Sequence, residues 1–236
     1  MFDLFADPAK VAQQLDIILN EFGFATWETL YSLVLEVAFA YLIGLPLGVL
    51  LVTGEKDSIR PLPGWLMQIL NVVINLLRSV PFLILMIITL PLSKIIVGTK
   101  VGTMATIPPM VIAAFPLVAR MVESSLREVD HGVIEAAQSM GASSWQIVRK
   151  VLLPEAVPSL LSGAAITIGT ILGYGAMTGI VGGGGLGKLA INYGYYNFKF
   201  IVMWAAVIGL IILVQIFQSA GTKLAAVCDK RLRNRS

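Results

Sequence analysis

The 236-residue chain is 57% apolar and only 13% charged, against roughly 45–50% and about 25% in a soluble domain. Its 17 basic and 14 acidic side chains leave a net charge of +3, which is too small an excess to indicate nucleic-acid binding. Several stretches of about 20 residues carry almost no charge, and that is the length a helix needs to cross a hydrocarbon layer of ~30 Å. The composition therefore excludes a soluble protein and predicts an all-α integral membrane protein.

Five transmembrane helices are predicted in chain order. They cover about residues 30–52, 66–90, 103–122, 159–181 and 200–220. Pro81 and Pro116 lie inside two of these runs, where neighbouring helices can satisfy the freed carbonyl groups. Residues 1–25 are expected to form an external amphipathic or interfacial arm, or else a disordered one, and they lack the features of a cleavable signal peptide. Residues 26–225 would form the transmembrane domain and residues 226–236 a basic cytosolic tail.

The positions of lysine and arginine predict the orientation, because cytoplasmic loops are enriched in both residues. With the N-terminus outside, the inside segments are about residues 53–65, 123–158 and 221–236. They hold eleven of the 17 basic residues, counting Arg120 at a boundary, and the outside segments hold five. The prediction is therefore an N-terminus outside and a C-terminus in the cytosol.

The longest inside segment contains a predicted helical corner, at about residues 131–155. A first helix is expected to end at Gly141, since glycine is the usual αL terminator. Ser143 or Ser144 can then cap a second helix. That second helix is expected to end before Pro154, because proline disfavours helix in the residue that precedes it.

The faces of this corner are apolar, although the predicted topology places it in the cytosol. The side chains concerned are those of Ala136, Ala137, Met140, Trp145, Ile147 and Val148. An apolar surface of this kind beyond the membrane can dock in a groove of another protein. The alternative is that these side chains pack against the cytoplasmic helix ends of the protein itself.

The order of residues in the corner resembles the EAA loop of ABC importer permeases. Glu135-Ala136-Ala137 is followed after three residues by Gly141, and a twelve-residue interval then ends in Leu153-Pro154. The resemblance implies that the segment forms coupling helices, which dock in a cleft of a partner ATPase. The residues assigned to this coupling are Glu135, Ala136, Ala137, Met140, Gly141, Trp145, Leu153 and Pro154.

Three further segments resemble methionine-importer permeases, so that the resemblance covers about residues 28–225. They are Arg78-Ser-Val-Pro-Phe82, Leu126-Arg-Glu-Val-Asp130 and Gly182 to Gly187. The resemblance implies a type I ABC importer permease fold in a bacterial inner membrane. It also implies a homodimer of this chain, two ATPase subunits, and a periplasmic or lipid-anchored binding protein. Methionine is the implied substrate, with another amino acid as the alternative. ATP and Mg²⁺ would bind to the ATPase, and this chain would hold no cofactor of its own.

The glycine-dense fourth span is where we expect the translocation path, together with part of the second span. The residues assigned to it are Arg78, Ser79, Pro81, Gly169, Gly173, Tyr174 and Met177. Glu36 and Arg78 are charges at similar predicted depth on consecutive spans. An unpaired charge there costs at least ~2.5–3.5 kcal/mol, so we hypothesise that the two form an ion pair that orients their helices. The alternative places Arg78 beside the carboxylate of the substrate.

The sequence predicts neither a catalytic site nor a metal site in this chain. An intramembrane enzyme needs a nucleophile–base pair or a metal cluster inside the spans, and His131 is the only histidine. A secondary transporter would need midplane acids or inverted repeats, and Glu36 is the only clear intramembrane carboxylate. Gly182 to Lys188 matches the first positions of a phosphate-binding loop, but Leu189 stands where that loop needs a hydroxyl. A flexible turn is predicted there instead.

Overall fold

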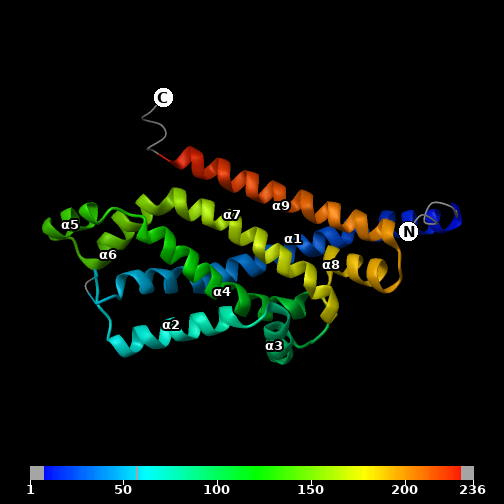
Figure 1. The fold of residues 1–236 in the computed structure, drawn as a ribbon, viewed down its shortest axis with the longest axis horizontal. Coiled ribbons are helices and arrows are strands. Elements are labelled where there is room, and N and C mark those ends of the chain that lie inside the picture. Colours follow the sequence, from blue (N-terminus) through cyan, green and yellow to red (C-terminus); the bar gives the residue numbers. More distant parts are fainter. Residues whose placement is uncertain (1–7, 57, 230–236) are drawn as a thin grey trace. The chain divides into compact units, whose positions relative to one another are not determined.

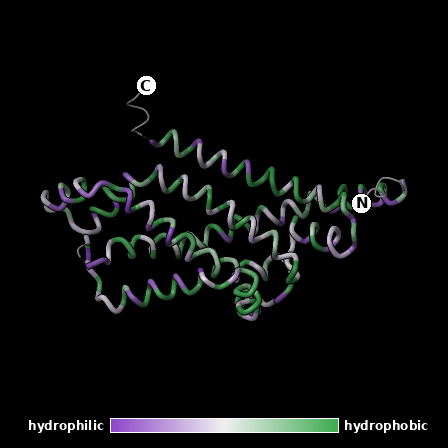
Figure 2. Tube along the Cα trace, in the orientation of Figure 1, coloured by the Kyte–Doolittle hydropathy of each residue, from purple (hydrophilic) through white to green (hydrophobic). Residues whose placement is uncertain are grey.

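A computed structural model describes residues 8–56 and 58–229, and every regular element in those ranges is a helix (Figure 1). Within the described residues, four helices are long and apolar enough to cross a membrane, and a bent pair of shorter helices makes a fifth if it counts as one span. Figure 2 shows the apolar character along α9 (Phe200–Cys228) and the hydrophilic stretches around α5 (His131–Ser139). The all-α class is confirmed. Residues 1–7 of the predicted arm (1–25) and residues 230–236 of the predicted tail (226–236) lie outside the described residues.

The predicted arm and the first span are one continuous helix in the structure. This helix, α1, runs from Pro8 to Thr53 over 46 residues and passes residue 25 without a break. At ~1.5 Å per residue it is about 69 Å long, roughly twice the thickness of a hydrocarbon core. Its first turns therefore continue the helical geometry beyond the apolar stretch, and their position outside the membrane stays a prediction.

The second predicted span is two helices rather than one. α2 (Gly64–Ser79) ends before an extended Val80, and α3 (Phe82–Val97) begins after Pro81, which occupies its N-cap position. The prediction of an unbroken run through Pro81 was wrong. The backbone reason is that a proline forces the preceding residue out of the helical region, and Val80 has φ −77° and ψ 130°.

The remaining elements follow in chain order. They are α4 (Thr103–Arg127), α5, α6 (Ser144–Ile147), the π-helix η2 (Val148–Leu152), α7 (Leu153–Met177), the 3₁₀-helix η3 (Thr178–Val181), α8 (Gly185–Lys188), the π-helix η4 (Leu189–Tyr196) and α9. Three of the predicted spans correspond to α4, to α7 with η3, and to α9, and the structure extends α4 and α9 at their C-terminal ends and α7 at its N-terminal end.

The second helix of the corner does not end before Pro154, contrary to the prediction. It passes from α6 through η2 into α7 without interruption. In the π-helical turn the amide of Leu153 donates to the carbonyl of Val148, five residues back. The next residue is Pro154, which has no amide hydrogen and so donates no helical hydrogen bond. The wider turn therefore lets the chain pass a proline and remain helical.

Contacts divide the chain into two compact units. Unit 1 consists of Met1–Ala38, Pro81–Ile112 and Ile168–Ile216, and unit 2 consists of Phe39–Val80, Ala113–Thr167 and Phe217–Ser236. The helices α1, α4, α7 and α9 each contribute to both units.

Unit 1 contains a backbone-to-backbone contact that only glycine permits. A Cβ atom on Gly187 of α8 would lie 2.3 Å from the carbonyl oxygen of Ala176 on α7, and one on Gly179 would lie 2.8 Å from the carbonyl oxygen of Gly187. Gly182 and Gly185 have φ angles of +83° and +74°, which side chains on L-residues rarely adopt. The glycine-rich segment is thus a closely packed turn.

Unit 2 packs α1 against α4 through a pair of glycines spaced four residues apart. A Cβ atom on Gly44 would lie 2.7 Å from the Cβ of Val118, and one on Gly48 would lie 2.6 Å from the Cβ of Val122. Small residues at this spacing let two helix backbones approach closely. Leu51, Ile74 and Ala119 form a buried cluster beside this contact.

Candidate coupling surface and polar sites

The predicted corner is present, with the glycine terminator and one of the two serine caps expected from the sequence, and with an aspartate cap that was not predicted. Asp130 caps α5 by accepting from the amide of Gly132 at 2.7 Å, and Gly141 ends the corner with φ +78°. Ser143 caps α6, and its backbone amide donates to the side chain of Gln146 in a capping box. The corner is also fixed to the chain segment after α1, because the Ser144 hydroxyl donates to the carbonyl of Ile59 at 3.1 Å.

The exposed apolar surface of the corner is smaller than predicted. Met140 is 81% exposed and Trp145 is 69% exposed, and Glu135 and Ala136 also face outward. The side chains of Ala137, Ile147 and Val148 are buried, since they pack into unit 2 and hold the two helices of the corner together. We call the exposed set of Val133, Ala136, Met140 and Trp145 the corner knob.

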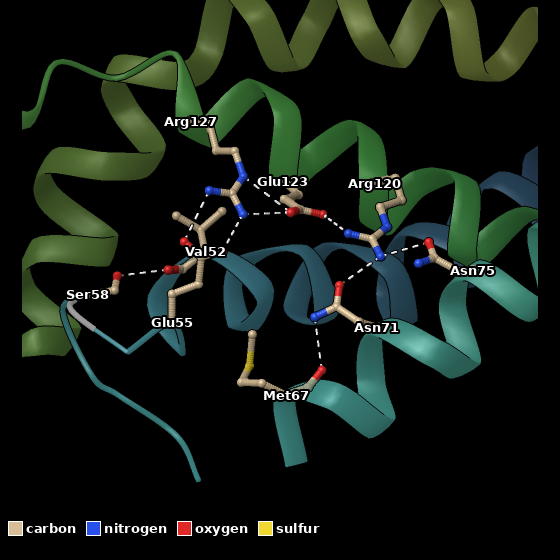
Figure 3. Close-up of polar contacts among 9 residues, drawn as sticks. All are labelled: Val52, Glu55, Ser58, Met67, Asn71, Asn75, Arg120, Glu123 and Arg127. Carbon is tan, nitrogen blue, oxygen red and sulfur yellow. Dashed lines mark hydrogen bonds and ion pairs between the residues drawn. The ribbon is translucent and has the colours of Figure 1, made fainter. Parts of the chain in front are cut away.

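A chain of charged and polar groups joins the turn after α1 to α2 and α4 in unit 2 (Figure 3). Glu123 lies at its centre: Oε2 accepts from Arg120 at 2.6 Å, and Oε1 accepts from Arg127 at 2.8 Å. Arg127 also makes two hydrogen bonds to Glu55, at 2.6 and 3.1 Å. Arg120 donates to the side-chain oxygens of Asn71 and Asn75 on α2, at 2.8 and 2.9 Å. The sequence reasoning missed this network, although the three- and four-residue spacing on α4 was a readable signal.

Acid is expected to weaken the outer part of this network. Hydrogen bonding to Arg127 holds the pKa of Glu55 below its usual value, so the ion pair stabilises the fold above the unfolded pKa of about 4.3 and loses that contribution as the pH falls through the folded pKa. Both side chains are about half exposed, so the Glu55→Gln variant should cost less than about 1 kcal/mol at pH 7.

The measurement is the thermal midpoint of the purified protein from pH 7 downward. The difference in thermal midpoint between the wild type and Glu55→Gln should become smaller as the pH falls. Glu128→Gln is the matched control, because Glu128 is exposed and makes no hydrogen bond or ion pair within the described residues. A gap that widened with acid would contradict the assignment.

The residues assigned to the translocation path divide between the units. Gly169, Gly173 and Met177 are four residues apart on α7 and share one face of it; Gly173 and Met177 are exposed. Tyr174 stacks on Phe82, with ring centroids 4.3 Å apart and planes 5° from parallel. Pro81 precedes that ring, and these residues belong to unit 1, whereas Arg78 and Ser79 belong to unit 2. The assignment of the whole set stays a prediction.

Glu36 is buried in unit 1, at 3% exposure. It lines a small cavity whose other polar groups are the hydroxyls of Thr29, Ser32, Thr103, Thr106 and Thr178. Arg78 belongs to unit 2, and the proposed pairing of Glu36 with Arg78 stays a prediction.

Glu28 is a second residue that the sequence reasoning missed. Its carboxylate accepts from the hydroxyl of Thr103 at 2.6 Å and from the backbone amide of Gly185 at 2.9 Å. The next amide, that of Leu186, donates to Thr29 at 2.9 Å. The start of α8 is therefore bonded to side chains of α1, and the prediction of a flexible turn in the glycine segment was wrong.

Comparison with known proteins identifies the family. The model of a "Binding-protein-dependent transport system inner membrane component" matches residues 44–233. The "Probable D-methionine transport system permease protein MetI" of Vibrio cholerae is 50% identical over 208 residues, which are 88% of this chain and 92% of that protein. The "Methionine import system permease protein MetP" of Bacillus subtilis is 42% identical over 220 residues, covering 92% and 97%.

Solved structures agree with the sequence relatives. A chain in "Inward facing conformations of the MetNI methionine ABC transporter: CY5 native crystal form" matches with a TM-score of 0.87 at 41% identity, over 90% of this chain and 98% of that one. A chain of an amino acid ABC transporter shares the fold at 18% identity, with a TM-score of 0.68. The predicted ABC permease fold and the inner-membrane location are confirmed. The chain belongs to the family of binding-protein-dependent transport system inner membrane components.

Proposed function

We propose that this chain is the permease subunit of an ATP-driven methionine importer. The observation that carries the proposal is the 50% identity over 88% of the chain to a D-methionine permease. The match at TM-score 0.87 to a methionine ABC transporter agrees with it. The translocation path would carry an amino acid across the membrane. ATP hydrolysis, with its Mg²⁺, would take place on a separate ATPase subunit.

The corner knob is proposed as the surface that contacts the ATPase. Its two largest side chains, Met140 and Trp145, are mostly exposed on a helical corner, and exposed apolar groups there can dock in a groove of a partner. The corner that carries them is rigid, because capped helices, buried Ile147 and the Ser144–Ile59 hydrogen bond fix its shape. A rigid corner can transmit the movement of an ATPase to α7, since the helix continues from α6 into α7.

The proposed assembly is a homodimer of this chain with two ATPase subunits on the cytosolic side and a binding protein on the opposite side. In this proposal the N-terminus is outside and the C-terminus is in the cytosol. ATP binding would close the ATPase pair and turn the permease outward to accept methionine. Hydrolysis would then return it to the inward-facing state.

Uptake of radiolabelled methionine into proteoliposomes tests the proposal. The vesicles contain this chain with the ATPase and binding protein encoded with it, and ATP is supplied on the ATPase side. The wild type should take up methionine only with ATP. Met140→Glu should reduce uptake and ATPase co-purification about 30-fold, because a contact at the centre of an interface contributes about 2 kcal/mol or more.

The matched control is Val227→Glu, which places the same charge at a residue that is 80% exposed and lies outside the corner. Neither substitution removes a buried contact, so each should leave the fold intact to within about 0.5 kcal/mol. ATP hydrolysis without methionine uptake would direct the search to another amino acid. Normal uptake by Met140→Glu would refute the role of the corner knob.

A further inference from the structure

An open pocket of about 510 Å³ lies between α2 and α4 in unit 2. Its lining is polar throughout and consists of Asn71, Asn75, Arg78, Arg120, Glu123, Ser124 and Arg127. The volume lies within the range of small-molecule sites. Most of the lining belongs to the network in Figure 3, which holds the arginine and asparagine side chains in place.

Charge pairing leaves one cation of this pocket unmatched. Arg127 is bonded to both Glu55 and Glu123, and Arg120 is bonded to Glu123. Arg78 is exposed, and within the described residues of unit 2 it makes no hydrogen bond or ion pair. The pocket and Glu55 together therefore contain three guanidinium groups and two carboxylates, which is an excess of one positive charge.

The hydrogen-bonding groups of the pocket also favour an anionic ligand. The side-chain oxygens of Asn71 and Asn75 both accept from Arg120, and both oxygens of Glu123 accept from arginines. The carboxylate and amide oxygens of the lining are thus engaged, whereas neither the amide nitrogen of Asn75 nor Arg78 donates a hydrogen bond within the described residues of unit 2, and the Ser124 hydroxyl can donate or accept. A pocket with engaged oxygens, available donors and one excess cation favours an anion.

We propose that this pocket binds the carboxylate of the transported amino acid, with Arg78 as the contacting group and Arg120 as the residue that positions Asn75. The inference rests on the proposed function as an amino-acid importer. Arg78 lies on a helix of a candidate span, and an arginine at membrane depth faces a water-filled path or a partner. A carboxylate fits the planar guanidinium through two parallel hydrogen bonds.

The test compares substitutions at Arg78 in the same proteoliposomes. Arg78→Gln should reduce methionine uptake about tenfold or more, since a hydrogen bond to a charged group is lost. Basal ATP hydrolysis is measured beside uptake as a readout of an intact permease–ATPase assembly, and the variant Arg60→Gln should leave both within about twofold of the wild type. Arg78→Lys should be intermediate, because lysine keeps the charge and loses the bidentate geometry. Arg60→Gln is the matched control: it removes the same charge from an exposed arginine outside the pocket.

A binding measurement separates the carboxylate from the rest of the substrate. Radiolabelled methionine is bound to the nucleotide-free permease–ATPase complex without binding protein, and binding to the ATPase alone is subtracted. Methioninamide, which lacks the carboxylate, should compete about tenfold less well than methionine against the wild type. For binding to the Arg78→Gln complex, methioninamide should compete with radiolabelled methionine about as well as unlabelled methionine does.

The outcomes are distinguishable from failure of the proposed function. If the wild type takes up no methionine, the importer proposal fails before any variant is compared. If the wild type is active and Arg78→Gln equals it, the carboxylate subsite is refuted. Loss of both uptake and basal hydrolysis in Arg78→Gln would indicate a structural role and would also refute it. An effect that appears only in vesicles containing phosphatidylglycerol would assign the pocket to a lipid phosphate and overturn the proposal.

Discussion

Gly187→Ala will prevent most of the protein from reaching a stable fold. The added Cβ would lie 2.3 Å from the carbonyl oxygen and 2.7 Å from the Cα of Ala176, and both are backbone atoms of α7. No side-chain rotation can relieve that overlap, so α8 must move away from α7. Such a movement would strain the hydrogen bonds from the amides of Gly185 and Leu186 to α1. The expected cost is about 3 kcal/mol or more.

The measurement is the yield and thermal midpoint of the monodisperse protein in detergent. Gly175→Ala is the matched control, because it adds the same methyl group to α7 at a position with no other atom within 4 Å. It should be neutral or slightly stabilising, since alanine favours helix over glycine by up to about 1 kcal/mol. A Gly187→Ala protein with the midpoint of the wild type would show that α7 and α8 are not packed as described.

Features encoded by a few adjacent residues were predicted well from the sequence. The corner at Gly141 is one, because a glycine at the end of a helix and a serine at the start of the next act through their own backbone. The membrane class follows from composition in the same way.

Element boundaries were predicted less well where opposing local signals compete. Charges near the N-terminus suggested an arm separate from the first span, yet polar residues do not interrupt a helix and α1 continues through them. Pro81 and Pro154 illustrate the other case. The first follows an extended residue, Val80, and marks a break between helices, whereas a π-helical turn leads into the second and the helix continues. Nothing adjacent to either proline in the sequence encodes that difference.

The polar contacts that join distant segments could not be predicted from the sequence. Arg127 and Glu55 are 72 residues apart, and Glu28 and Gly185 are 157 apart. Only the packing of α1 against its neighbours brings these groups together. Their chemistry was visible as isolated charges near helix ends, which in a membrane protein usually indicate orientation alone.

Glu123→Gln will destabilise unit 2 more than any other change of a single charge in the network. Glu123 is 11% exposed and accepts three hydrogen bonds, from Arg120 and from two nitrogens of Arg127. A glutamine keeps the shape but has one acceptor oxygen, and its amide group would face a guanidinium. Arg120 is only 20% exposed and would keep its charge without a carboxylate partner. Breaking such a pair from one side costs about 2–4 kcal/mol after allowing for partial exposure.

A double-mutant cycle decides whether this cost arises from the Arg120–Glu123 pair. The variants are Glu123→Gln, Arg120→Gln and the combination, with Glu128→Gln as the control for loss of an exposed carboxylate near the end of α4. The pair should show a coupling free energy of about 1 kcal/mol or more, so the double variant should be less destabilised than the sum of the singles. Additive losses would mean that the network stabilises through separate contacts to α2 and to Glu55. In that case its central carboxylate would not hold Arg120 and Arg127 as one unit, and Arg120 would be positioned beside Asn75 by its contacts to α2 alone.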